Sequence, residues 1–166
     1  MRTQNKILIL FILIISFSCV KEKKLLRIME GEWTLERIEY AGIAHDTTLF
    51  ISETFLDFKK CSKGDNNSGG VCNLIYTSKN NPFNFIYQVG AGSKNTDHIT
   101  IQNSTDNDKY NQSYIDAKLM LLDSNQSGLF YMPDSKTDNM VLNGVLDSYL
   151  IFGKEYSKKT LYLVKK

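Results

Sequence analysis

Short segments in which apolar and polar residues alternate recur along this chain, and they constrain its fold more than any other feature. The clearest begins at Phe83 and ends at Val89, where every second residue is aromatic or β-branched. Because successive side chains of a β-strand point to opposite faces, this alternation predicts a strand with one buried face. An Asn-Asn-Pro turn precedes the segment and a Gly-Ala-Gly turn follows it.

Similar segments follow one another at a spacing of about ten residues, without a long helical period between them. Residues 114–122 fit a helix as well as a strand, because they contain enough apolar side chains for either. About eight to ten short strands predict an all-β domain, either a single antiparallel up-and-down β-barrel or a two-sheet sandwich. The expected strands cover residues 31–40, 47–52, 54–61, 71–78, 83–89, 98–103, 114–122, 129–132, 140–152 (one strand or two) and 160–164.

The first expected strand, residues 31–40, changes phase along its length. Trp33 and Leu35 fall on one face, whereas Ile38 and Tyr40 fall on the other. An extra residue in one strand of a pair restores a single buried face, so this change of phase predicts a β-bulge or a strong twist.

The beginning of the chain combines charge, apolar length and a small residue in a fixed order. Arg2 and Lys6 precede an apolar run from Ile7 to Phe17, and a serine stands directly before Cys19. This order is typical of a secretory signal peptide. The run is too short for a transmembrane helix, which needs about 20 apolar residues. A buried N-terminal helix or strand is the alternative, but it would need neither the cations nor the small residue.

The charges of the chain balance once the signal segment is set aside. The whole chain has 20 Lys and Arg against 18 Asp and Glu, a formal net charge of +2. Arg2 and Lys6 account for that surplus, so the remaining residues carry no net charge. A nucleic-acid partner would call for a basic patch or stripe, and none is expected.

Two cysteines flank a polar, glycine-rich stretch. Cys61 and Cys72 lie on either side of residues 62–70, between two expected strands. A hairpin would bring the two sulfurs together, and export would place them where disulfides persist. Such a bridge would stabilise the fold by roughly 3 kcal/mol, and two buried thiols are the alternative. A zinc site is not expected, because His45 and His98 lack the spacing of metal ligands.

The cysteine at the expected cleavage point makes the N-terminus resemble a bacterial lipoprotein signal with its lipobox. The resemblance implies cleavage before Cys19, diacylglycerol on its sulfur and acylation of the new amino terminus. A single acyl chain binds membranes only marginally, whereas two or three chains anchor a protein stably. Val20, where some lipoproteins of this kind have Asp, implies sorting to the outer membrane.

Gly31 and Trp33, one residue apart at the start of the first strand, resemble the Gly-x-Trp signature of lipocalins. The order of parts resembles that of bacterial lipocalin-like lipoproteins, with a lipobox, a short tether, Gly-x-Trp, an early cysteine pair (Cys61 and Cys72) and a strand at residues 160–166. The resemblance implies a signal peptide (1–18), a lipidated cysteine with its tether (19–30) and a lipocalin-like barrel (31–166).

Within that barrel, Trp33 is expected to close one end and Gly31 to let the entering chain approach it closely. Apolar residues from Leu25 to Met29 predict a short helical turn just before the first strand. Lipocalins usually carry an arginine near the last strand that packs over the tryptophan, and this chain has none there. Lys159 and Lys165 are the residues that could take its place.

No pattern of catalytic residues is visible, so the chain is not expected to be an enzyme or to hold a cofactor or a metal. Two functions fit the fold. In the first, the barrel holds a small hydrophobic ligand. In the second, the barrel is filled and the protein is a structural or interaction module of the cell envelope. Interior volume separates the two. The candidate lining residues are Phe58, Tyr76, Phe85, Tyr87 and Leu121.

Overall fold

The structure is a computed structural model that describes residues 21–42, 46–61, 72–92, 97–104, 111–122, 127–132, 137–144, 149–151 and 154–166. Residues 21–29 form a helix, and a second helix, α2, covers Gln112–Leu121. None of the helices in these ranges is long and apolar enough to cross a bilayer. The strands are β1 (Gly31–Ala41), β2 (Asp46–Phe50), β3 (Thr54–Phe58), β4 (Cys72–Ser78), β5 (Asn81–Gly90), β6 (His98–Asn103), β7 (Ser127–Tyr131), β8 (Asn139–Gly144), β9 (Tyr149–Ile151), β10 (Lys154–Tyr156) and β11 (Lys158–Lys165).

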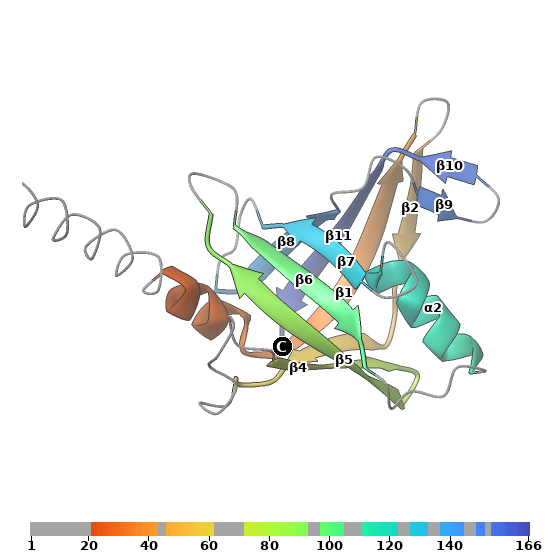
Figure 1. Cartoon of the computed structure of the whole chain (residues 1–166). Helices are drawn as coiled ribbons and strands as arrows, with labels where there is room; N and C mark the ends of the chain where they lie inside the picture. Colours follow the sequence, from red (N-terminus) through yellow and green to blue (C-terminus); the bar gives the residue numbers. More distant parts are fainter. Residues whose placement is uncertain are drawn as a thin grey trace, which may run out of the picture.

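The strands form a closed antiparallel barrel, as the sequence predicts (Figure 1). Strand β1 pairs with β11 on one edge and with β2 and β3 on the other, which closes the sheet. Because β2 and β3 share one edge of β1, they act as a single strand with a kink, where Glu53 has φ 54°. Counted in this way, eight strands follow one another around the barrel in chain order. This is the up-and-down meander.

The change of phase in β1 is accommodated by a bulge, as expected. The register between β1 and β11 shifts between Leu35 and Arg37. As a result Trp33, Leu35, Ile38 and Tyr40 are all buried in the interior of the barrel. The bulge therefore converts two opposed faces of the sequence into one continuous face of the core.

Two segments differ from the expected order of strands and turns. Residues 114–122 belong to α2, in which Tyr114, Ala117 and Leu121 are buried. Their spacing of three and four residues is that of one helix face, and it competes with the alternation that favoured a strand. The segment between the last two expected strands, residues 153–159, contains β10, which pairs with β9 in a small separate hairpin. The expected stretch 140–152 is two strands, β8 and β9.

The barrel has two ends with different covers (Figure 1). The closed end is defined by the start of β1, the end of β11 and the helix over residues 21–29, which fulfils the expected helical turn. The α2 end is defined by the end of β6, the start of β7 and α2, which connects them along the chain. The helix over 21–29 and α2 lie at opposite sides of the molecule in Figure 1.

Candidate functional site

The closed end is built around Trp33, which has no exposed surface. Its Nε1 donates a hydrogen bond of 2.7 Å to the carbonyl of Met29, in the helix that precedes β1. The Nζ of Lys165 lies 5.2 Å from the centre of the Trp33 ring and also donates to the carbonyl of Ile28, at 3.3 Å. Lys165, and not Lys159, therefore takes the position over the tryptophan, where a cation is attracted by the face of the ring.

Gly31 is required by the same arrangement. Its φ of +118° is a conformation that residues with a Cβ rarely adopt. A Cβ built there would also lie 3.4 Å from the Cε of Lys165. Glycine at this position allows the chain to leave the helix, enter β1 and pass beneath the stem of Lys165.

The helix over residues 21–29 is attached to the barrel at both of its ends. Leu25 and Met29 are buried against the core. Lys21 at its beginning forms an ion pair with Asp97 at 2.6 Å and donates to the carbonyl of Gly92 at 2.8 Å. Most of the expected tether, residues 19–30, is thus an ordered part of the domain.

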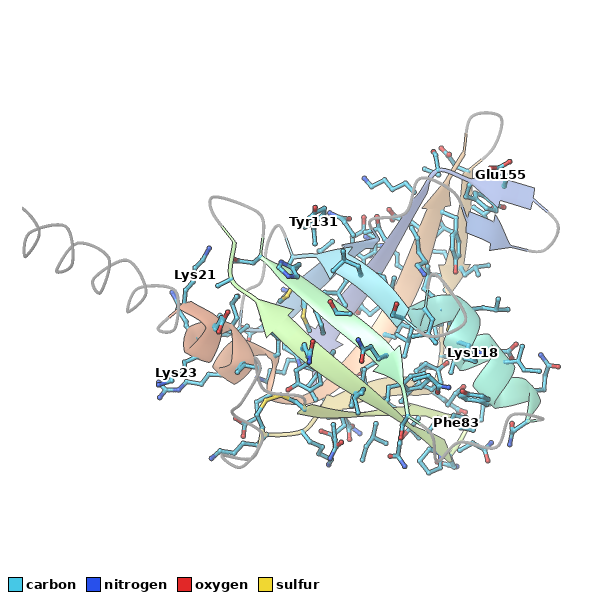
Figure 2. All side chains as sticks on the ribbon, in the orientation of Figure 1. Lys21, Lys23, Phe83, Lys118, Tyr131 and Glu155 are labelled. Carbon is cyan, nitrogen blue, oxygen red and sulfur yellow. A yellow bond between two sulfur atoms is a disulfide. The ribbon has the colours of Figure 1, made fainter. Side chains whose placement is uncertain are left out.

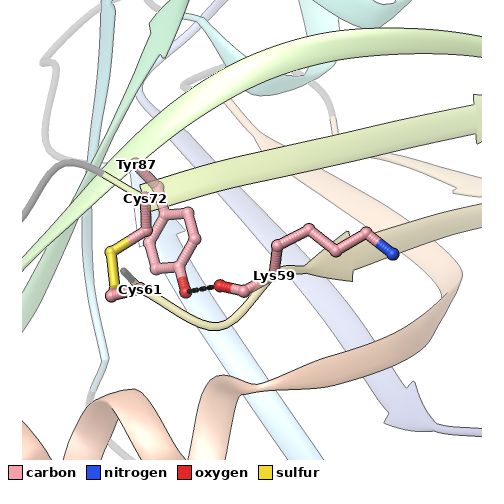
Figure 3. The surroundings of a disulfide bond; sticks show 4 residues. All are labelled: Lys59, Cys61, Cys72 and Tyr87. Carbon is pink, nitrogen blue, oxygen red and sulfur yellow. Dashed lines mark hydrogen bonds between the residues drawn. A yellow bond between two sulfur atoms is a disulfide. The ribbon is translucent and has the colours of Figure 1, made fainter. Parts of the chain in front are cut away.

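The expected disulfide joins Cys61 to Cys72 at the same end of the barrel (Figure 3). Their Cα atoms are 4.8 Å apart, and Cys61 lies just beyond β3 while Cys72 begins β4. Beside them the hydroxyl of Tyr87 donates to the carbonyl of Lys59 at 2.9 Å. Burial raises the pKa of Tyr87 above its ordinary value, so this hydroxyl stays protonated and remains a donor.

The five candidate lining residues all lie inside the barrel. Their exposed fractions are 0% for Phe58, Phe85 and Leu121, and 1% for Tyr76 and Tyr87. Two pairs of these rings meet edge to face, Phe58 with Tyr87 at 5.2 Å and Tyr76 with Phe85 at 6.5 Å between centroids. Such contacts add to the stability that burial provides. The sequence predicted their inward direction, and Leu121 reaches the interior from α2 instead of from a strand.

At the α2 end, the helix covers the interior with its apolar face. The ring of Tyr114 packs against Phe83 and Phe85, with centroids 5.7 and 6.3 Å apart. The Tyr114 hydroxyl donates to Asn103 Oδ1 at 2.6 Å, which ties the beginning of α2 to the end of β6. The hydroxyl of Tyr76 donates to the sulfur of Met120 at 3.4 Å. Aromatic side chains from β5, β4 and α2 thus meet beneath the helix.

The end of α2 lies on a buried cation, Lys159 of β11. Lys159 has no exposed surface, and its Nζ lies 3.4 Å from the carbonyl of Leu122 and 5.1 Å from the centre of the Phe130 ring. Cations are stabilised at the carboxyl ends of helices. Gly128 lies against the same turn, because a Cβ there would be 2.1 Å from the carbonyl oxygen of Leu121.

The outer surface carries two further features. Ile115 and Leu119, four residues apart on the outer side of α2, are 39% and 47% exposed. On the strands β1 and β11, the Tyr162 hydroxyl donates to Glu39 at 2.7 Å, and Arg37 donates to the same carboxylate at 2.9 Å. These two hydrogen bonds, that of Tyr162 first, lower the pKa of Glu39.

Several predicted features lie outside the described residues: the signal segment, Cys19, His45 and the hairpin tip at residues 62–71. Among the residues that are described, no three His, Cys, Asp or Glu side chains gather as they would around a metal ion. No protein-family model, curated protein or solved structure gives a significant match to this chain. The architecture and the packing of its two ends are therefore the basis for an inference about function.

Proposed function

We propose that the chain is a lipid-anchored lipoprotein of the bacterial cell envelope, similar to the lipocalin-like lipoproteins, and that its barrel is a filled scaffold that acts through its outer surface. The protein is then a structural or interaction module without catalytic activity. The hypothesis that the barrel carries a small hydrophobic ligand is the competing one.

The packing of the five candidate lining residues supports the filled barrel. A cavity wide enough for a ligand would leave surface on the side chains that line it, even when it is closed to the outside. Phe58, Phe85 and Leu121 expose no surface, and Tyr76 and Tyr87 expose 1%. A ligand would therefore have to displace these rings from one another, at the cost of the contacts that they make.

A cavity-forming variant tests the filled barrel against the ligand-binding barrel. Phe85→Ala should open an apolar cavity beneath Tyr114, and an apolar cavity of about 150 Å³ is enough to bind benzene. We expect benzene to raise the thermal midpoint of the variant and not that of the wild type. Fatty acids and other hydrophobes should likewise leave the wild type unchanged. A saturable shift of the wild-type midpoint would contradict the filled barrel and favour ligand binding.

The lipid anchor is supported by the order of cations, apolar run and small residue before Cys19. Expression in a bacterial host with radiolabelled palmitate tests it. The wild type should incorporate label and fractionate with the outer membrane, whereas Cys19→Ala should do neither. The variant Cys61→Ala is the matched control, because it removes a cysteine of the barrel and should still be labelled. Equal labelling of the wild type and Cys19→Ala would end the proposal.

A further inference from the structure

Three cations lie together on the outer side of the helix over residues 21–29. Lys23, Lys24 and Arg27 are exposed, while Leu25 and Met29 face the barrel. Arg27 follows Lys23 by four residues and Lys24 by three, and these spacings place the three charges on one side of the helix. Figure 2 shows Lys23 and Lys21 at one side of the molecule and Lys118 and Glu155 at the other.

We propose that this basic face, Lys23, Lys24 and Arg27, binds the anionic phospholipid headgroups of the membrane that holds Cys19, so that the closed end of the barrel faces the bilayer. The proposal rests on the proposed lipid anchor. Its chemical basis is charge complementarity: each Lys or Arg near an anionic lipid surface strengthens binding about fivefold. Glu22 is the acidic neighbour on this helix, and it lies half-buried at the edge of the face.

The short distance from the anchor supports this orientation. Lys21, two residues after Cys19, already belongs to the helix, and two residues span at most about 7 Å. A lipid on Cys19 therefore places the beginning of the helix at the bilayer surface.

The attachments of the helix carry that orientation to the barrel. The ion pair of Lys21 with Asp97 and the bond of Trp33 to Met29 hold the helix at both ends. The bond of Lys165 to Ile28 adds a third attachment. A helix held in this way cannot turn its basic face without turning the whole domain.

Acetylation of lysines in the intact lipidated protein tests the orientation. The protein is reconstituted on the outside of two kinds of vesicle. The neutral vesicles are pure phosphatidylcholine, and the anionic vesicles also contain about 30% phosphatidylglycerol, which supplies the negative charge. Acetylation rates are then read by mass spectrometry. Lys23 and Lys24 should react at least tenfold more slowly on the anionic vesicles, and high salt should restore their rates. Lys79 and Lys158, exposed at the α2 end, should react equally on both. Equal rates at Lys23 and Lys24 on both vesicles would overturn the proposal.

The variant Arg27→Glu keeps both reporter lysines and reverses the third charge. It should weaken the protection of Lys23 and Lys24 about fivefold or more. The matched control Lys158→Glu, which makes the same charge change at the α2 end, should leave that protection intact. Protection that survives Arg27→Glu, or that Lys158→Glu also removes, would count against the basic face.

Flotation on the neutral vesicles separates this proposal from the anchor. Pure phosphatidylcholine offers no net charge, so flotation with it reports the lipid on Cys19 alone. Failure to float there contradicts the proposed anchor. Slower acetylation of Lys23 and Lys24 in the presence of anionic vesicles would still support the basic face in that case, and unchanged acetylation would refute it.

Discussion

The closed end and the α2 end both bury aromatic side chains but are held by different kinds of contact. At the closed end the directional contacts dominate: the bond from Trp33 to Met29, the ion pair of Lys21 with Asp97, and a disulfide. At the α2 end a single helix rests on the interior, mostly through apolar contacts. A segment that is held by fewer contacts opens at a lower free energy. We therefore expect α2 to separate from the barrel more often than the helix at the closed end does.

The largest effect is expected from removing Trp33 at the closed end, and removal of Tyr114 is the matching change at the α2 end. Trp33→Ala should lower the free energy of unfolding by about 3–5 kcal/mol, since a cavity and an unpaired Met29 carbonyl remain. Tyr114→Ala should cost less, about 2–3 kcal/mol, because α2 can settle into the space. Urea unfolding followed by circular dichroism measures both. An equal loss of stability in the two variants would contradict the claim that the closed end is held more firmly than the α2 end.

Loss of the disulfide should be the next largest effect, and it concerns the closed end. The double variant Cys61→Ser and Cys72→Ser should be less stable by roughly 3 kcal/mol, because the unfolded chain regains the freedom of the loop. Reductant should destabilise the wild type by a similar amount and leave the double variant unchanged. A wild type whose urea midpoint does not respond to reductant would contradict this expectation.

Gly128→Ala should act on the α2 end alone. The new Cβ would meet the carbonyl of Leu121, so α2 must shift, at a cost of about 1–3 kcal/mol. Hydrogen exchange should accelerate at the amides of α2 and not in residues 21–29. Acceleration in both helices would show that the two ends are coupled, and would reject the picture of independent covers.

Lys165→Met should have a smaller effect at the closed end. The methionine keeps much of the apolar stem and loses the cation over Trp33, at a cost of about 1 kcal/mol. Trp33 is the only tryptophan of the chain, so its fluorescence reports this site directly. The emission should change in Lys165→Met and not in Lys159→Met. The reverse result would exchange the roles of the two lysines.

The smallest effect is expected from the outer surface, at Glu39. Its pKa lies below the ordinary value of 4.5 in the folded state, chiefly because the Tyr162 hydroxyl donates to it. The resulting stabilisation is present above pH 4.5 and is lost as the pH falls through the folded pKa. In Tyr162→Phe the pKa of Glu39 should return toward its ordinary value, so the free energy of unfolding should decrease less steeply as the pH falls below 4.5. Urea unfolding between pH 3 and 7 measures this slope. An unchanged slope would contradict the role of this hydroxyl.

The sequence predicted the barrel because each of the strands β3 to β8 has one buried face, and alternation records that directly. It left α2 open because Tyr114, Ala117 and Leu121 have helical spacing while Ile115 and Leu119 are exposed apolar residues. With apolar side chains on both sides, a strand and a helix fit the same segment. The run Ala-Lys-Leu-Met-Leu, all strong helix formers, was the signal that favoured the helix.

The roles of Lys159 and Lys165 could not be separated from the sequence. They lie an even number of residues apart on β11, so alternation sends both to the interior. Only the pairing of the strands distinguishes them, since Lys165 stands opposite Trp33 and Lys159 stands opposite Tyr40. The disulfide was predictable because both cysteines flank one hairpin. The attachment of Lys21 to Asp97 was not, because it depends on how the helix docks on the β5–β6 side.

The docked helix over residues 21–29 also determines how far α2 would stand from the bilayer. Strand β5 spans ten residues, about 33 Å along its length, and a tilt of about 40° leaves about 25 Å along the barrel axis. With Cys19 in the bilayer, the exposed Ile115 and Leu119 of α2 would stand that far out in water. Under the proposed anchor, a protein that bound this face would have to reach it from the aqueous compartment and not from the plane of the lipid.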